Sequence, residues 1–328
     1  MKYILGIDQG GTKTAAAIMD RNGLIVGAAY VEGAYHPHDG LEYALKCMKE
    51  AVLEAEKQAG VARTDIELVV AGITGVDWPE DYKFFQKALQ QHLEVEKIEV
   101  HNDSVIAMYG GTRKTYGMVL CAGTGLNGAI LDSSGKTFIF GDYIEENMQG
   151  GSALAHRALR KVFDAYLGLC DETELTDLFL AFAKVGTVDE LLHKFMTNAD
   201  FSKQIKLLIP QIMQLAQRGE KVTCALVDSF AEKMCRYVAA GLRKMNMTSE
   251  NVEIVLAGSV FKGEQNRLTS RLVELLNNSE MNVEVVLAEY EPVVGACIKG
   301  LLQDGFLSET IQQTIRKSAQ EKSLDITC

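Results

Sequence analysis

Proline, tryptophan and paired cysteines are scarce in this sequence. The 328 residues include four prolines, one tryptophan and no low-complexity segment, which argues against disordered linkers. The seven cysteines form no Cys-x-x-Cys pair, so we expect reduced thiols and not a disulfide framework. No apolar run is long enough to span a bilayer, and the apolar stretch at the N-terminus is interrupted too early for a signal peptide. These absences favour a soluble cytoplasmic protein.

Positive charge is also in short supply. The formal net charge of −11 argues against nucleic acid or an anionic membrane surface as the main partner. Hydrophobic residues make up 47% of the chain, which is enough for a substantial core. Because 328 residues are many for a single core, we expect two domains.

The sequence does contain a glycine-rich stretch close to its beginning. Residues 3–7 form an apolar run typical of a buried strand, and the pair Gly10-Gly11 permits a tight turn soon after it. The hydroxyls and ammonium of the segment Thr12-Lys13-Thr14 suit phosphate oxygens. Asp8, an acid at the end of a strand, suits hydrated Mg²⁺, which binds one or two carboxylates and keeps several waters.

The segment after this turn decides what kind of loop it is. Residues 15–20 read as a second strand that ends in a hairpin turn, so the glycine-rich loop joins two antiparallel strands. Rossmann and P-loop phosphate sites lead from a strand into a helix instead. The loop is therefore predicted to be a phosphate hairpin of another kind, with an ordinary glycine-rich turn as the alternative.

The predicted elements then follow the same pattern twice. After the first hairpin we expect strands at 24–31, 66–73 and 98–101, a loop at 32–40, and helices at 41–60, 81–93 and 104–109. A second copy begins near residue 116, with strands at 117–122 and 129–132 around a Gly/Thr turn at 123–128. Helices dominate residues 151–247. The remaining expected elements are strands at 252–256 and 283–287, a helix at 267–277, and a last long helix beginning near residue 291.

Several motifs, in this order and spacing, resemble the N-acetylglucosamine kinase group of the BadF/BadG/BcrA/BcrD-type ATPase family, within the actin, hexokinase and Hsp70 superfamily. The resemblance implies an α/β fold with two ribonuclease-H-like (actin-like ATPase) domains around an interdomain nucleotide cleft. It implies domains at 1–115 and 116–291, with the helix from about 292 packing back on the first. The motifs are residues 6–14, 71–77, 102–103, 123–127, 151–153, 256–260 and 292–296.

The resemblance also implies roles for the residues that would bind ATP and Mg²⁺. The two Gly/Thr hairpins would hold the phosphates from opposite sides of the cleft, and Asp8 would hold Mg²⁺ through water. The turn at Gly258-Ser259 would lie against the adenosine. The phosphate-binding residues are then Gly10, Gly11, Thr12, Lys13, Thr14, Gly123, Thr124 and Gly125.

Asp103 is the candidate general base. A sugar hydroxyl is a poor nucleophile until a carboxylate accepts its proton, and an acid at the end of a strand can face a cleft. The alternative is that Asp103 caps the helix expected from Ser104, because Asn, Asp and Ser all favour that position. The sequence alone leaves both roles open, and the resemblance favours the catalytic one.

The same resemblance implies a sugar pocket on the other side of the loops. Asp77 could instead cap the helix near Asp81, and Asn127 could be an ordinary turn residue. The pair His36 and His38 could suggest a metal site, but surface histidines are the simpler reading. Trp78 could stack on a sugar ring or pack in the protein. The residues that the resemblance places around the sugar are His36, Gly75, Asp77, Asn102, Asn127 and Gln149.

The sequence departs from the family on this sugar side. Where related kinases have Gly-Asp-Glu-Gly-Ser, this chain has Met148-Gln149-Gly150-Gly151-Ser152, and Glu145 and Glu146 lie out of register. Glutamine can bind hydroxyls but cannot carry charge. The resemblance implies an ATP- and Mg²⁺-dependent kinase of a sugar or amino sugar, N-acetylglucosamine-like, acting as a homodimer. The alternatives are a non-catalytic nucleotide or sugar sensor and an activator ATPase with an iron–sulfur cluster, which the scattered cysteines disfavour.

Overall fold

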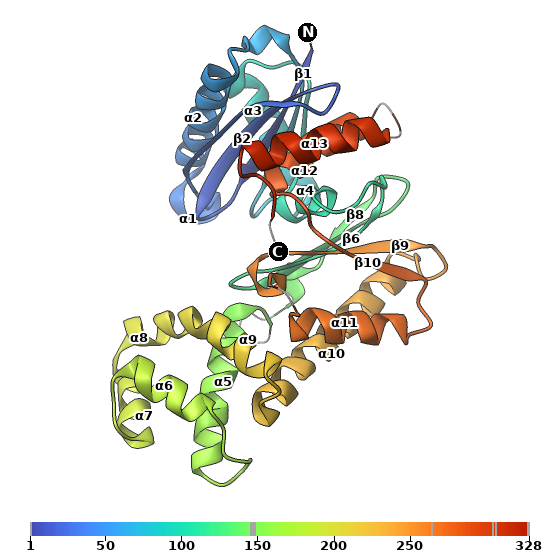
Figure 1. Ribbon diagram of the computed structural model, residues 1–328. Helices are drawn as coiled ribbons and strands as arrows, with labels where there is room; N and C mark the ends of the chain where they lie inside the picture. Colours follow the sequence, from blue (N-terminus) through green and yellow to red (C-terminus); the bar gives the residue numbers. More distant parts are fainter. Residues whose placement is uncertain (1, 145–148, 264, 304, 306, 327–328) are drawn as a thin grey trace.

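Two five-stranded sheets organise the chain. The computed structural model describes residues 2–144, 149–263, 265–303, 305 and 307–326. The first sheet has the order β3-β2-β1-β4-β5 and the second has β10-β9-β6-β7-β8, which is the same order when numbered from its own first strand. This repeated order confirms the predicted fold class of two ribonuclease-H-like halves (Figure 1).

The strands of the first sheet lie close to the predicted ranges. β1 pairs with β2 in antiparallel register from Tyr3 opposite Asp20 to Gln9 opposite Thr14, which confirms the hairpin. β4 and β5 run parallel to β1. The strands are β1 Tyr3–Gln9, β2 Lys13–Asp20, β3 Ile25–Glu32, β4 Ile66–Ile73 and β5 Ile98–Asn102.

The second sheet begins with a similar hairpin, in which β6 and β7 are antiparallel. β9 runs parallel to β6, and β10 runs parallel to β9. The strands are β6 Gly117–Ala122, β7 Leu126–Leu131, β8 Thr137–Ile139, β9 Val252–Ala257 and β10 Val283–Leu287.

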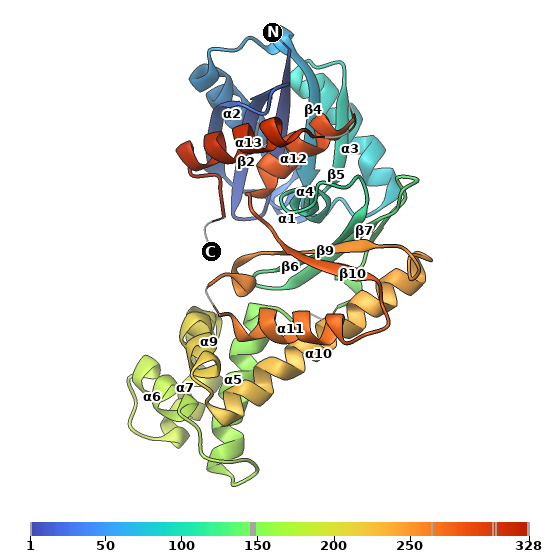
Figure 2. The ribbon, with the colours of Figure 1, turned by 45° about the vertical axis from the view of Figure 1, so that its right-hand side comes forward.

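Helices cover both faces of each sheet. α2 (Leu41–Ala59) and α3 (Pro79–Leu93) pack on one face of the first sheet, and their apolar residues share a core with its strands. α4 (Asp103–Tyr109) and α12 (Pro292–Leu302) lie between the two sheets, and α13 (Glu309–Glu321) packs beside β3 (Figure 2). α5 (Gly151–Tyr166), α10 (Lys221–Lys244) and α11 (Arg267–Asn277) cover the far face of the second sheet. The helical region beyond it holds α6 Leu175–Ala183, α7 Val188–Thr197, α8 Ala199–Gln204 and α9 Ile209–Gln217.

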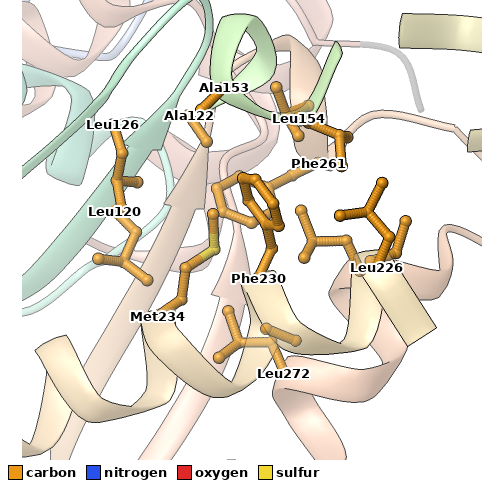
Figure 3. Packing of buried hydrophobic residues seen from close by; sticks show 14 of the residues in the cluster. Leu120, Ala122, Leu126, Ala153, Leu154, Leu226, Phe230, Met234, Phe261 and Leu272 are labelled. Atoms are coloured by element: carbon orange, nitrogen blue, oxygen red, sulfur yellow. The ribbon is translucent and has the colours of Figure 1, made fainter. Parts of the chain in front are cut away.

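The largest apolar core lies directly behind the second hairpin turn. Ala122 and Leu126, on either side of the turn, are buried against Ala153 and Leu154 of α5 and against Phe230 of α10 (Figure 3). Because both ends of the turn are anchored in a dry core, its backbone has a defined position.

α12 lies against the first half of the molecule. It packs on β1, β4 and α4, and the Lys299 ammonium lies 2.7 Å from the Glu99 carboxylate on β5. A Cβ at Gly295 would lie 2.1 Å from the carbonyl oxygen of Ile106, so this close crossing of α12 and α4 requires glycine. The domain boundaries near residues 115 and 291 stay predictions.

Three expectations about single elements were wrong. The predicted loop at 32–40 contains the short helix α1 (His36–Asp39), for which Pro37 supplies a preset φ. The second hairpin turn is shorter than predicted, because β7 begins at Leu126 and pairs Asn127 with Cys121. The last long helix ends at Leu302, Gly305 has a φ of +110°, and α13 begins at Glu309. Within the described residues no helix is long and apolar enough to cross a membrane.

Candidate active site

The topology of the first sheet brings three chain segments to one edge. β1, β4 and β5 are parallel, so their carboxyl ends meet there. The segments that leave these ends are residues 10–12, residues 74–77 and Asp103. In α/β sheets ligands bind outside the carboxyl ends of parallel strands, and this edge is therefore the place to look for a site.

A cleft of about 700 Å³ opens at this edge and is closed on its other side by the β6–β7 hairpin. Its size is in the usual range for small-molecule sites. Both halves of the chain contribute to its walls, which agrees with an interdomain cleft. Ten predicted site residues line it: Gly10, Gly11, Thr12, Gly75, Asp77, Asp103, Gly123, Thr124, Gly125 and Asn127.

Asp103 is the first residue of α4 and faces this cleft. The helix is capped by its neighbour, because the Asn102 side chain accepts a hydrogen bond of 2.9 Å from the N–H of Ser104. The capping role that the sequence left open therefore belongs to Asn102. Burial raises the pKa of Asp103, and hydrogen bonds from the Ser104 N–H and the Thr74 side chain partly oppose this.

Asn102 does not line the cleft, although the sequence placed it in the sugar pocket. It is buried, and its Nδ2 donates a hydrogen bond of 2.7 Å to Oδ1 of Asp77. One amide thus connects the end of β5 with the loop after β4. Asp77 is therefore held by Asn102, while the cap of α3 lies at Trp78, whose N–H donates to Asp81 at 3.1 Å. Asp77 is not the helix cap that the sequence allowed.

Two carboxylates, Asp77 from the first half of the molecule and Asp142 from the second, make one end of the cleft negatively charged. Burial raises the pKa of Asp77 to about 6, and the negative charges of Asp142 and Asp103 add to this effect. Asp142 belongs to the turn η2 (Gly141–Tyr143) after β8 and also lines the cleft. Within the described residues no lysine, arginine or histidine lines the cleft.

Asp8 lies behind the first loop at the end of β1 and is only 7% exposed. Burial raises its pKa to about 7, and Asp103 and Glu291 add negative charge while Lys13 opposes them. A desolvated carboxylate among other acids fits a hydrated Mg²⁺, which needs few protein ligands. Among the described residues no group of three His, Cys, Asp or Glu side chains could hold a metal ion by itself.

The raised pKa of Asp8 predicts a pH-dependent stability of the nucleotide-free protein. The folded pKa of about 7 lies above the value of about 4 for an unfolded chain, so the folded state binds the proton more tightly. This contribution to stability is complete below pH 4 and is lost as the pH rises through 7. We expect Asp8→Asn to raise the unfolding free energy by on the order of 2 kcal/mol at pH 8 and by much less at pH 5.

Urea unfolding of both proteins in a chelator, at pH 5 and at pH 8, measures this difference. Asp171→Asn is a matched control, because Asp171 is an exposed carboxylate that pairs with the exposed Lys221. An equal effect of Asp8→Asn at both pH values would show that its carboxyl does not titrate in this range.

Four predicted phosphate- or adenosine-binding residues lie beside the cleft without lining it. The Lys13 ammonium lies 2.6 Å from the Glu291 carboxylate at the start of α12. Thr14 is fully buried in β2. Gly258 packs against the backbone of Ala122, so its turn and the neighbouring Ser259 lie next to the second hairpin.

The two remaining sugar-side predictions also fall outside the cleft lining. His36 packs its ring on Phe85 at 4.7 Å, and its Nε2 lies 3.2 Å from the carbonyl oxygen of Gly75. It is therefore partly buried and supports the loop that carries Asp77. Gln149 is 2% exposed, and within the described residues its Oε1 has no hydrogen-bond partner. Trp78 is 56% exposed and does not line the cleft, so it is not packed inside the protein.

The structure explains why residue 150 is a glycine and not the acid that related kinases carry. Gly150 has a φ of +88°, and a Cβ there would lie 2.3 Å from the carbonyl carbon of Gly125. The next N–H groups bind the hairpin turn, since Gly151 donates to the Gly123 oxygen at 2.8 Å and Ser152 to the Thr124 oxygen at 2.9 Å. The start of α5 is thus in direct contact with the second loop. Glu145, Glu146 and Met148 lie outside the described residues.

Several residues near the cleft were not assigned a role from the sequence. Thr74 lines it, and only its place in a predicted loop could have indicated this. Asp142 also lines the cleft and received no role from the sequence, and Glu291 was read only as the start of a helix. No local signal relates Glu291 to Lys13, because 278 positions separate them.

The sequence was compared with protein families and with known proteins. The model of the BadF/BadG/BcrA/BcrD ATPase family matches residues 5–300. An N-acetylmuramic acid/N-acetylglucosamine kinase from Clostridium acetobutylicum is 23% identical over 305 aligned residues, in an alignment that covers 91% of this chain and 98% of that protein. A glucosamine kinase (GspK) from Vibrio cholerae is 28% identical over 252 aligned residues, in an alignment that covers 72% of this chain and 84% of that protein.

The fold comparison agrees with the family match. A Chromobacterium violaceum structure of a protein named as a candidate N-acetylglucosamine kinase has a TM-score of 0.66 and 19% identity. The match covers 91% of this chain and 99% of that one. At this identity the likeness shows a shared fold and nothing finer.

Proposed function

Because this chain belongs to the BadF/BadG/BcrA/BcrD ATPase family, we propose that it is an ATP-dependent kinase that phosphorylates a hydroxyl group of a sugar or amino sugar. The observation that carries this proposal is the position of Asp103. Its carboxylate shares one cleft with two Gly/Thr hairpins, one from each sheet. The names of the relatives, which are kinases of N-acetylglucosamine, N-acetylmuramic acid and glucosamine, support an N-acetylglucosamine-like acceptor.

In this proposal Asp103 accepts the proton of the acceptor hydroxyl as that oxygen attacks the γ-phosphorus of ATP. The Thr74 hydroxyl and the start of α4 hold the carboxylate in place. The backbones of residues 10–12 and 123–125 orient the phosphates from two sides, and orientation supplies much of the rate in phosphoryl transfer. Closure of the cleft would keep water away from the reacting phosphate.

Asp8 is the residue that would hold Mg²⁺, through water, close to the phosphates. The ion would neutralise part of the negative charge of the phosphates. No lysine, arginine or histidine among the described residues lines the cleft, so without the ion only the nearby Lys13 could do this. The Lys13 ammonium, which is paired with Glu291 in this structure, would bind the phosphates when they compete with that carboxylate. The adenosine would lie near the turn at Gly258 and Ser259. A homodimer, which the family resemblance implies, stays a prediction.

A coupled assay of ADP release from Mg-ATP tests the function. The acceptors are N-acetylglucosamine, glucosamine, N-acetylmuramic acid and glucose, beside a reaction without acceptor. We expect one of them to raise ADP release at least about tenfold, and mass spectrometry to show a phosphorylated sugar. Reactions without Mg²⁺ check the metal requirement.

The alternative is a sensor that binds nucleotide or sugar without turnover. The absence of both family carboxylates at Gln149 and Gly150 is the feature that favours it. Calorimetry with ADP and with each sugar distinguishes the two functions. Nucleotide binding without turnover of any acceptor would contradict the kinase and favour the sensor.

A further inference from the structure

We propose that Asp142 binds the acceptor and is the carboxylate that the second half of the molecule contributes to the acceptor end of the cleft. This inference rests on the proposed kinase function. Related kinases carry two acids at the positions that are Gln149 and Gly150 in this chain. The inference assigns the role of an acid to Asp142, which lies at neither position.

The position of Asp142 is well defined by its surroundings. Phe140, the residue before the turn η2, is buried, and its ring packs so closely on Gly128 that a Cβ there would lie 2.0 Å from it. Within the turn, the N–H of Tyr143 donates to the Phe140 oxygen at 3.1 Å, and the N–H of Ile144 donates to the Gly141 oxygen at 2.9 Å. The turn therefore holds the Asp142 backbone at the wall of the cleft.

Asp142 and Asp77 approach the same part of the cleft from opposite halves of the molecule. Both line it, and after burial the charge of Asp142 is the largest influence that raises the pKa of Asp77. A nearby like charge disfavours the ionised form of a carboxyl group, which agrees with two side chains that face one cleft. A ligand with several hydrogen-bond donors between them, such as a sugar with hydroxyl or amino groups, would satisfy both.

The two replaced family positions cannot supply this carboxylate. Gly150 has no side chain, and its Cβ position is filled by the backbone of Gly125. Gln149 is 2% exposed and does not line the cleft. Among the described residues of the second half that line the cleft, the acid is Asp142.

Acceptor kinetics of Asp142→Asn test the inference. The charged hydrogen bonds that it would lose predict a rise of about 10-fold to 100-fold in KM for the acceptor, with KM for ATP within about twofold of wild type. Calorimetric titration with N-acetylglucosamine, or with the acceptor that the panel identifies, should show the same loss of affinity without turnover. Because Asp142 is exposed, the variant should fold normally, and its melting temperature checks this.

Two further variants sharpen the result. Asp142→Ala should weaken acceptor binding at least as much as Asp142→Asn, while Asp171→Asn, at an exposed ion pair away from the cleft, should leave both KM values unchanged. An acceptor KM for Asp142→Asn within twofold of wild type would overturn the inference and leave the kinase function intact. A wild-type protein that turns over no acceptor would instead overturn the proposed function, and this inference with it.

Discussion

Replacing Asp103 with asparagine is expected to lower kcat by about 10²- to 10⁴-fold, the usual contribution of a general base. Asparagine has nearly the same shape and can still accept hydrogen bonds from Thr74 and from the start of α4. It cannot take a proton from the acceptor hydroxyl. The loss should therefore fall on kcat, while the affinity for ADP stays within about twofold.

Three measurements separate this result from damage to the fold. The melting temperature should not fall, because the substitution removes a carboxylate whose pKa is raised by burial. Calorimetry with ADP checks the nucleotide site, and Asp171→Asn serves as the surface control. The wild-type enzyme should lose activity towards acid pH as Asp103 is protonated, starting at a higher pH than for an ordinary carboxyl. An Asp103→Asn variant with a tenth or more of the wild-type kcat would contradict the role of base.

The second large effect concerns the position where related kinases carry glutamate. Restoring it with Gly150→Glu is expected to abolish measurable activity and to lower the unfolding free energy by about 2–4 kcal/mol. The backbone has a φ of +88°, which glutamate adopts at a cost, and its Cβ would meet the carbonyl carbon of Gly125 at 2.3 Å. Either the turn at residues 123–125 moves or α5 loses its contact with it.

A smaller side chain and a matched glycine make this prediction specific. Gly150→Ala adds only the Cβ and should already displace the second loop, raising KM for ATP. Gly168→Ala is the control, since Gly168 has a φ of +72° and no neighbour within 4 Å of its Cβ position. It should lose about 1 kcal/mol from backbone strain alone and keep full activity. A Gly150→Glu protein as stable and active as wild type would show that the loop does not depend on this contact.

Much of the fold followed from local patterns along the chain. The strands at 3–9, 66–73 and 98–102 end close to where the sequence predicts, because apolar runs followed by small or polar residues mark strand ends locally. The two Gly/Thr hairpins were predictable for the same reason, and with them seven of the ten predicted residues that line the cleft. Asp103 faces the cleft because it directly follows a parallel strand, and that order can be read from the sequence.

Other features of the site depend on contacts between segments that are distant in the sequence. Asn102 was predicted to bind sugar, yet its neighbours direct its amide to Asp77, 25 positions away. Lys13 was predicted to meet phosphate, yet a residue 278 positions away holds its ammonium in this structure. Such partners are set by how sheets and helices pack, and a local pattern carries no information about them.

The sequence by itself therefore determined the two-fold repeat of the α/β pattern, the two Gly/Thr hairpins and the place of Asp103 after a parallel strand. The tertiary structure decided which polar side chains reach the cleft. In the sequence, the missing acids at residues 149–150 suggested that the chain could have lost catalysis. In the structure, contact with the loop at Gly125 requires a glycine at position 150, and another acid, Asp142, lines the cleft. Strand and turn preferences act over a few residues, while the direction of a side chain in a cleft is the outcome of packing across the whole molecule.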